Sequence, residues 1–546
     1  MNASRFRPPS GPLAKLLTAW LLASAGGWAF TIVAAVYAFD RSGAGAVGLV
    51  TAAQLLPAVL TAPLTGTLID RLGRAGVVAG AWVVEALSIG AAATLMSVHG
   101  ALWPVILFAA ARSAAATAPR PALEALMPAL ASTPDELVRA TAAWSAIDSA
   151  GFMIGGGGGG IAIALLGAGA VTAVAAALFG VAAMFARRLP WVKAIEADEP
   201  EEEEGGLGDA LAGLRALGHE PLLRTAFVLL AALTLIEGTT SVQLVVLSIS
   251  HLRMGNGGPG QLYAVWGFGG VVGSGALLAL VRWRGYGLAL LSGALVFAVG
   301  VGVAGAGGIP IALVAMLPAG IGFALVETAV IALVPRLADD VVAGRVYGLA
   351  EVLYAGGAGV GALIAPVLIR ALGASASLAA VGAGFGALAI IVSRALTRLD
   401  VGQEEASRVR ELLRGISFLA PLPLPRLERL VRRAEPVTVP AGAAVITAGE
   451  PGTEFYVIAD GVVEIVGYGR TQGPGSGFGE IALLADVPRT ATVRALTDLK
   501  LWSLNRSSFV AAVSSHGDVA SLADATIAEH LARPRASDEA GSTRGS

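Results

Sequence analysis

Between Leu13 and Ile391 the chain consists of apolar runs separated by short polar breaks. A helix that crosses a bilayer needs about 20 mainly apolar residues, and these runs have that length. Charged residues make up 14% of the chain, whereas a soluble domain carries about 25%. Most of the chain should therefore face lipid. We predict about twelve spans, at 13–37, 45–66, 75–97, 101–118, 139–165, 168–186, 224–249, 260–281, 286–306, 309–334, 345–369 and 374–396.

Several classes of protein are excluded by what the sequence lacks. It has no cysteine and five scattered histidines, which excludes disulfides, thiol catalysis and cysteine-ligated metal, so we predict no metal site. The net charge of −2 gives no basic excess for nucleic acid. The ATP-binding pattern GxxxxGK[ST] is also absent. We predict that the protein is not an enzyme and that it has no catalytic residues and no cofactor.

The character of the chain changes after Asp400, where charged residues become frequent. We predict a transmembrane domain over 1–400 and a soluble domain over 401–546. Lys and Arg gather in the breaks after even-numbered spans, which places those breaks and both termini in the cytoplasm of a multi-pass cell-membrane protein. The central break, 187–223, holds the acidic run Glu201–Glu204. This run is either a docking surface for a basic partner or a solvated linker.

The membrane half contains an internal repeat. The sequence ALMPALA at 125–131 matches ALVPRLA at 332–338, so that Pro128 and Pro335 are 207 residues apart. Each copy precedes the fifth span of its half. Two six-span repeats around a substrate path are typical of secondary transporters.

The break between the second and third spans carries a recognisable motif. Its residues Gly66, Asp70, Arg71, Gly73 and Arg74 follow the pattern GxxxDRxGR. This resembles the signature of the major facilitator superfamily, whose members are all-α polytopic membrane proteins. The resemblance implies that this loop acts as a clasp between the two halves during alternating access.

Two further patterns resemble one branch of that superfamily. Arg112 in the fourth span resembles an arginine implicated in proton coupling, although Ala116 replaces the glycine of its motif. The glycine run 155–160, which follows Gly151, resembles an antiporter signature, with Gly156 in place of proline. Together they imply an exporter similar to drug and siderophore exporters, driven by a proton antiport. The alternative for the glycine run is close packing of helices.

Acidic residues inside spans are costly and therefore informative. Glu85 in the third span and Glu237 in the seventh are candidate proton carriers, because burial favours a protonated carboxyl group. Three other acids lie nearer the cytoplasmic ends, where we expect them to pair with Arg112, Arg120 or Arg71: Asp148, Glu327 and Glu351. Nothing in the sequence identifies the small-molecule substrate.

From Glu435 the pattern changes to short strands with glycine turns, which predicts a small β-roll or barrel, and we expect a β-roll flanked by helices. In the segment 475–493, glycines can bring backbone N–H groups to an anion and a lone arginine can bind phosphate. The segment resembles the phosphate-binding cassette of cyclic nucleotide-binding domains. The resemblance implies that Glu480 binds the ribose hydroxyl and Arg489 the cyclic phosphate. The implied pocket is completed by Gly479, Ile481, Ala482, Thr490 and Ala491.

The resemblance leaves the nucleotide open between cyclic AMP and cyclic GMP, although a hydroxyl at Thr490 can favour guanine. The combined reading is a proton-coupled exporter that a cyclic nucleotide regulates. Two alternatives remain. The transporter-like half could have stopped transporting and serve only to anchor a cyclic nucleotide receptor. The nucleotide pocket could also have lost its ligand.

Overall fold

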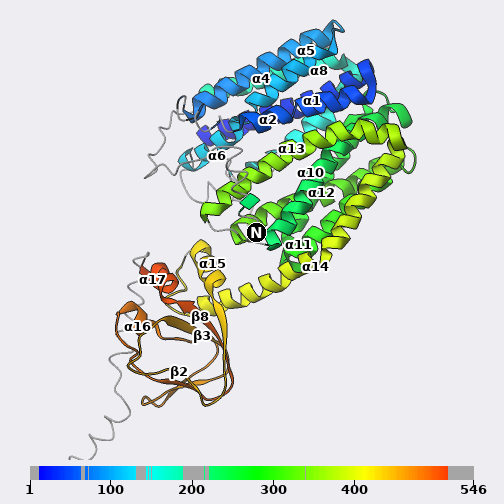
Figure 1. The fold of residues 1–546 in the computed structure, drawn as a ribbon. Helices are drawn as coiled ribbons and strands as arrows, with labels where there is room; N and C mark the ends of the chain where they lie inside the picture. The colour runs from blue at the N-terminus through cyan, green and yellow to red at the C-terminus, as the bar shows by residue number, and fades with distance from the viewer. Residues whose placement is uncertain are drawn as a thin grey trace, which may run out of the picture. The chain divides into compact units, whose positions relative to one another are not determined.

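The computed structural model describes residues 11–514, except for 63–64, 66–67, 70, 72, 131–139, 141–142, 145–146, 149, 189–213, 216–220, 338–339 and 423. The chain folds into two compact units, Met1–Asp400 and Val401–Ser546. Figure 1 shows a helical first unit and a second unit built around strands. Most of the acidic central break and the end of the chain lie outside the described residues.

The regular secondary structure in the described part of the first unit is all helical. Its helices are α1 (Gly11–Ala53), α2 (Leu56–Thr61), α4 (Arg74–Ser97), α5 (Leu102–Ala115), α6 (Pro119–Leu130), η2 (Phe152–Gly158, a π-helix), α8 (Gly159–Arg187), α10 (Pro221–Val246), η3 (Leu247–His251, a π-helix), α11 (Gly258–Val303), α12 (Ile309–Leu337), α13 (Asp340–Leu372) and α14 (Ala374–Gly415). The last of these continues beyond residue 400 into the second unit.

Ten helical stretches among the described residues are long and apolar enough to cross a membrane. Two of them contain a break in helical geometry, one at Ser42 and Gly43 and the other at Gly167. Each break falls between two spans predicted from the sequence, so the ten stretches overlap all twelve predicted segments, of which 45–66 and 139–165 lie partly outside the described residues. The predicted all-α polytopic fold is confirmed.

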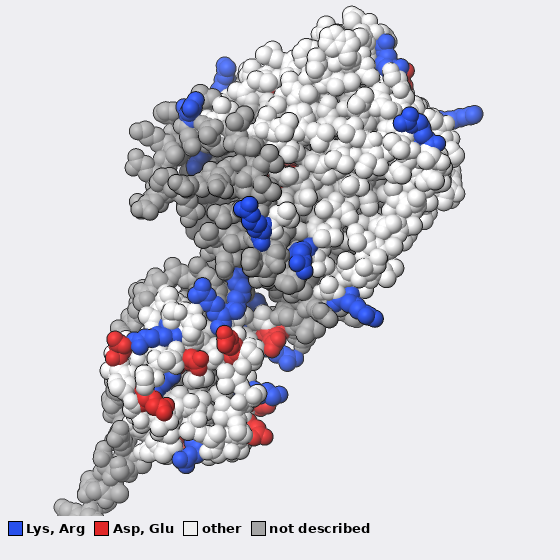
Figure 2. Space-filling view, viewed as in Figure 1, with Lys and Arg blue, Asp and Glu red and all other residues white. Residues whose placement is uncertain are grey.

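The helices of each repeat pack mainly with one another. In the first repeat α4 packs against α5 and α8, and in the second α11 packs against α12 and α10 against α13. Large side chains such as Trp82, Phe30 and Phe297 are fully buried between helices. The face of this unit visible in Figure 2 is almost uncharged, with its few Lys and Arg at the margins. A surface of this kind suits hydrocarbon.

The two repeats touch through their backbones at one end of the bundle. A Cβ atom added to Gly160 of α8 would lie 2.4 Å from the Cα of Gly260 in α11, and one added to Gly157 would lie 2.7 Å from the Cβ of Ala264. At the same end Asn256 Nδ2 donates a hydrogen bond of 2.8 Å to Asp40 Oδ2 in the first repeat. These contacts close the bundle at this end. They also support the packing interpretation of the glycine run.

The second unit contains two antiparallel four-stranded sheets, as expected for a β-roll. One has the order β1-β8-β3-β6 and the other β2-β7-β4-β5. The elements are α15 (Leu424–Arg433), β1 (Glu435–Val439), β2 (Ala444–Ile446), β3 (Glu454–Asp460), β4 (Val463–Ile465), β5 (Arg470–Gln472), β6 (Gly477–Phe478), α16 (Glu480–Leu484), β7 (Val493–Ala495), β8 (Leu499–Asn505) and α17 (Arg506–Ser514).

Strand β3 separates two apolar clusters of this unit, because neighbouring side chains of a strand point to opposite faces. Phe455 packs with Phe418 and Phe509 in a cluster that includes the end of α14, together with α15 and α17. On the other face, Ile458 belongs to the cluster formed by the strands. The short helix α16 contributes Leu483 to the first cluster, which fixes the position of the segment that precedes Arg489.

The contact between Gly160 and Gly260 generates a prediction about stability. Gly160→Ala should lower the midpoint of thermal unfolding in detergent, because its methyl group would overlap the backbone of α11. Gly158→Ala is the matched control, since a Cβ there meets no atom within 4 Å. The control should be neutral or stabilising by about 0.5–1 kcal/mol, because alanine favours the helix over glycine. Equal midpoints for the two variants would contradict the close contact.

Candidate functional site

The loop of the GxxxDRxGR motif is only partly described. Gly66 and Asp70 lie outside the described residues. Arg71 is exposed, and Gly73 has a φ of +72° immediately before α4 begins at Arg74. A positive φ of this size favours glycine, so Gly73 suits the start of this helix. The clasp role of this loop remains a prediction.

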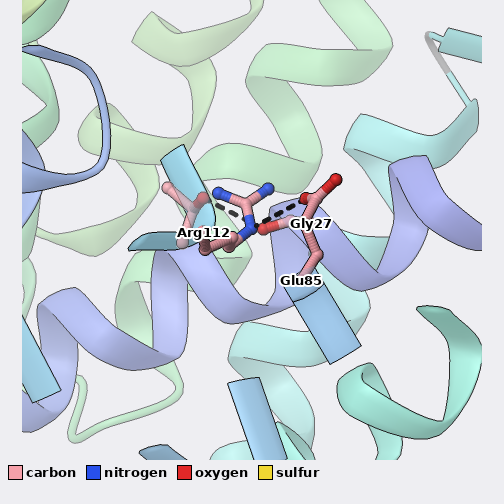
Figure 3. A network of polar contacts seen from close by, with 4 residues as sticks. Gly27, Glu85 and Arg112 are labelled. Carbon is pink, nitrogen blue, oxygen red and sulfur yellow. Dashed lines mark hydrogen bonds and ion pairs between the residues drawn. The ribbon is translucent and has the colours of Figure 1, made fainter. Parts of the chain in front are cut away.

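Arg112 of α5 and Glu85 of α4 form an ion pair inside the first repeat. Arg112 Nε lies 3.5 Å from Glu85 Oε2, and the two side chains are 13% and 3% exposed. Figure 3 shows them meeting beside Gly27 of α1, where an added Cβ would lie 2.7 Å from Arg112 Nη2. The guanidinium also lies within 6 Å of the ring centroids of Phe30 and Phe179.

This pairing changes the interpretation of Glu85. The sequence suggested an acid free to carry a proton, whereas the structure gives its charge a cationic neighbour. The pair is a contact between charges rather than a hydrogen bond, since Arg112 Nε has no hydrogen-bond partner among the described residues. Its members are on different helices, so no pattern local to one span could have revealed the contact.

Glu237 of α10 has a different environment. It lies within electrostatic range of Glu327 in α12 and of Tyr263 in α11. Tyr354 of α13 is within range of both carboxyl groups. Glu237 and Glu327 are partly exposed although they belong to membrane helices. Two carboxyl groups within electrostatic range repel when both are ionised, and protonation of either one removes that repulsion.

Polar groups of the first repeat are in electrostatic range of this pair. Asp148 accepts a hydrogen bond of 2.8 Å from Trp20 Nε1 and lies 3.9 Å from Arg120 Nη2. Asp148 and Arg120 both interact with Glu327 across the repeats. The predicted pairing of Asp148 with an arginine is confirmed, and Glu351, also in range of Glu327, is exposed.

In the second unit, Arg489 is held beside α16 by backbone carbonyl groups. Its Nη1 donates to Gly479 O at 3.0 Å and its Nη2 to Glu454 O at 2.7 Å, and the residue is 5% exposed. Gly479 has a φ of +95°, and a Cβ there would lie 2.6 Å from Arg489 Nη1. Only glycine satisfies both conditions. The bonds to Gly479 O and Glu454 O are the two hydrogen bonds that Arg489 donates within the described residues, and an arginine has five N–H groups, so others can bind a ligand.

The other residues predicted for the pocket lie around this arginine. Glu480 is the first residue of α16, is buried, and interacts electrostatically with Arg489. Ala482 is buried under Gly452, while Ile481, Thr490 and Ala491 are partly exposed. The structure therefore brings the predicted residues to one place. The contacts with ribose, phosphate and base stay predictions.

Two residues of β3 that the sequence analysis did not single out also approach Arg489. The hydroxyl of Tyr456 donates to Glu454 Oε2, and its ring stacks on Phe478 with centroids 5.4 Å apart. Burial, and then this hydrogen bond, raise the pKa of Tyr456 to about 12. Burial lowers the pKa of Arg489, while Tyr456 and Glu454 act in the opposite direction. The sequence offered one signal for this contact: Glu454 and Tyr456 are two residues apart on a predicted strand, so their side chains share a face of the sheet.

Comparison with known proteins agrees with this architecture. The sequence of residues 16–361 matches the family Major Facilitator Superfamily, and that of residues 436–516 matches the family cyclic nucleotide-binding domain. The first match covers more than half of the chain, so the chain belongs to the major facilitator superfamily. It is a membrane protein of the transporter type joined to a cyclic nucleotide-binding domain.

Individual relatives cover one part or the other. A cyclic nucleotide-gated potassium channel of Mesorhizobium japonicum is 33% identical over 24% of this chain and 39% of the channel. A cAMP-dependent protein kinase regulatory subunit of Yarrowia lipolytica is 44% identical over 13% of this chain and 19% of that protein. The solved nucleoside transporter NupG superimposes on 71% of this chain and 99% of its own, with a TM-score of 0.57 and 13% identity. The last similarity concerns the fold alone.

The buried ion pair generates a second prediction. Glu85→Gln should destabilise the protein by about 3–5 kcal/mol, because it leaves Arg112 charged and unpaired in the bundle. Replacing both residues, as Glu85→Leu with Arg112→Leu, should cost less than the single change, since no buried charge is left. Thermal unfolding and the yield of monodisperse protein in detergent would measure both. A double variant less stable than Glu85→Gln would contradict this account.

Proposed function

We propose that the protein is a proton-coupled secondary transporter, an exporter of small molecules, whose conformational equilibrium is regulated by a cyclic nucleotide. The observation that carries the regulatory part is the buried Arg489, held by two carbonyl groups with N–H groups to spare. The contacts that join the two repeats at one end of the bundle, at Asn256 and at Gly160, support the proposal that the protein is a transporter. In this proposal both termini are cytoplasmic and the protein resides in the cell membrane.

The proposed cycle uses groups of both repeats. The contacts of Gly160 with Gly260 and of Asp40 with Asn256 would separate when the bundle opens at that end. Glu237, next to Glu327, would gain and lose the coupled proton. We assign this role to Glu237 rather than Glu85, because Glu85 already has Arg112 as its partner. Cyclic AMP or cyclic GMP would shift the equilibrium by its difference in affinity for the two states.

The main test needs no transported substrate. The chain has no natural cysteine, so spin labels can be placed at Ser42→Cys and His251→Cys, two exposed positions at the closed end in different repeats. The labelled full-length protein in nanodiscs should show a short and a long distance. Cyclic AMP or cyclic GMP should change their ratio. An unchanged ratio with bound nucleotide would favour the anchored-receptor alternative.

The nucleotide site itself gives a prediction for binding. Calorimetry on the full-length protein should show binding of cyclic AMP or cyclic GMP, and Arg489→Ala should weaken it by two to three decades. Removing one partner of a desolvated charged contact costs about 3–5 kcal/mol, which corresponds to that loss. Arg494→Ala is the matched control, because Arg494 is an exposed arginine of the neighbouring strand β7. Equal losses in the two variants would contradict a phosphate contact by Arg489.

Proton coupling gives a prediction for the labelled protein. Changing the pH from about 6 to about 8 should alter the ratio of the two distances, since a coupled carboxyl group exchanges its proton in this range. Glu237→Gln should remove that pH dependence, because the amide cannot take up a proton. Glu411→Gln, at an exposed acid of the second unit, should retain it. Persistence of the full pH response in Glu237→Gln would exclude Glu237 as the proton site.

A further inference from the structure

Arg489 has an acidic side chain next to it that does not pair with it. Glu454 offers Arg489 its backbone carbonyl at 2.7 Å. Its carboxylate is within electrostatic range of the guanidinium, yet it forms no ion pair with Arg489 within 4 Å in the described part of the chain. One carboxylate oxygen instead accepts the hydrogen bond from Tyr456 Oη. The acid is thus held by a neutral partner.

An acid in this position competes with a phosphate ligand. A carboxylate and a phosphate both match the planar fork of an arginine, and both are strong acceptors. If the Glu454 carboxylate turned onto the free N–H groups of Arg489, it would neutralise the charge that the phosphate needs. Phosphate would then have to displace a paired acid before binding.

Tyr456 is well placed to prevent this pairing. Residues 454 and 456 are two apart on β3 and therefore share a face of the sheet. The ring of Tyr456 is fixed by stacking on Phe478, its register partner on β6. The hydroxyl therefore approaches the carboxylate from a rigid position, and the hydrogen bond to an ionised acceptor is of the strong kind.

We propose that Tyr456 is a positioning residue, which binds the Glu454 carboxylate so that it does not pair with Arg489 and compete with the phosphate of the cyclic nucleotide. This rests on the proposed nucleotide binding. Tyr456 need not touch the ligand. Its effect should therefore depend entirely on the acid at position 454.

That dependence is measured by a double-mutant cycle on the full-length protein. Tyr456→Phe keeps the ring and its stacking but removes the hydroxyl. It should weaken cyclic AMP and cyclic GMP binding about two- to fivefold, the size expected for a partly exposed ion pair competing with the ligand. Glu454→Gln should bind at least as tightly as the wild type. The double variant should bind like Glu454→Gln, because the carboxylate that Tyr456 holds away from Arg489 is no longer there.

The outcomes separate this inference from the proposed function. If the wild type binds neither nucleotide in calorimetry, the proposed function fails and the inference fails with it. If the wild type binds but Tyr456→Phe is unchanged, only the inference fails. A double variant as weak as Tyr456→Phe would mean that the hydroxyl acts on the ligand or the fold directly, which also overturns it. Thermal unfolding of each variant checks that the domain is folded.

Discussion

Hydrocarbon offers no hydrogen bonds and no counter-charges, and the first unit is organised by that constraint. Its backbone polar groups must be satisfied within each span, so the spans in its described part are helices. Its ionisable side chains must find partners inside the bundle. Arg112 meets Glu85, and Asp148 meets both Arg120 and Trp20. The charged neighbour of Glu237 is another acid, Glu327.

The two units use arginine in contrasting ways. Arg112 is compensated by a carboxylate and by two aromatic rings, which leaves little charge for a ligand. Arg489 is held by carbonyl oxygens, which orient the guanidinium without neutralising it. A buried cation that is oriented but not neutralised is suited to bind an anion. The difference lies in the partners rather than in the degree of burial.

The lengths of the apolar runs and the pattern of the short strands predicted most of the fold. A membrane span needs about 20 apolar residues, and a half-buried strand alternates apolar and polar residues. The twelve segments and the β-roll followed from these patterns, and the cassette pattern placed Gly479 beside Arg489. The pairing of Glu85 with Arg112 could not be predicted, since it depends on how two helices are rotated against each other. The role of Glu454 and Tyr456 was also missed, because their spacing is common to many strands and only the approach of Arg489 makes it informative.

If the bundle opens at this end as proposed, the crossing of Gly160 and Gly260 has a consequence for the cost of moving between states. A closure made by long side chains must immobilise their rotamers each time it forms, and each such side chain loses up to about 2 kcal/mol of conformational entropy. Two glycines have no rotamers to lose, so this part of the closure forms and separates without that entropy cost. A single directional contact, from Asn256 to Asp40, lies at the same end. Smooth backbone surfaces of this kind favour rapid exchange between states of similar free energy.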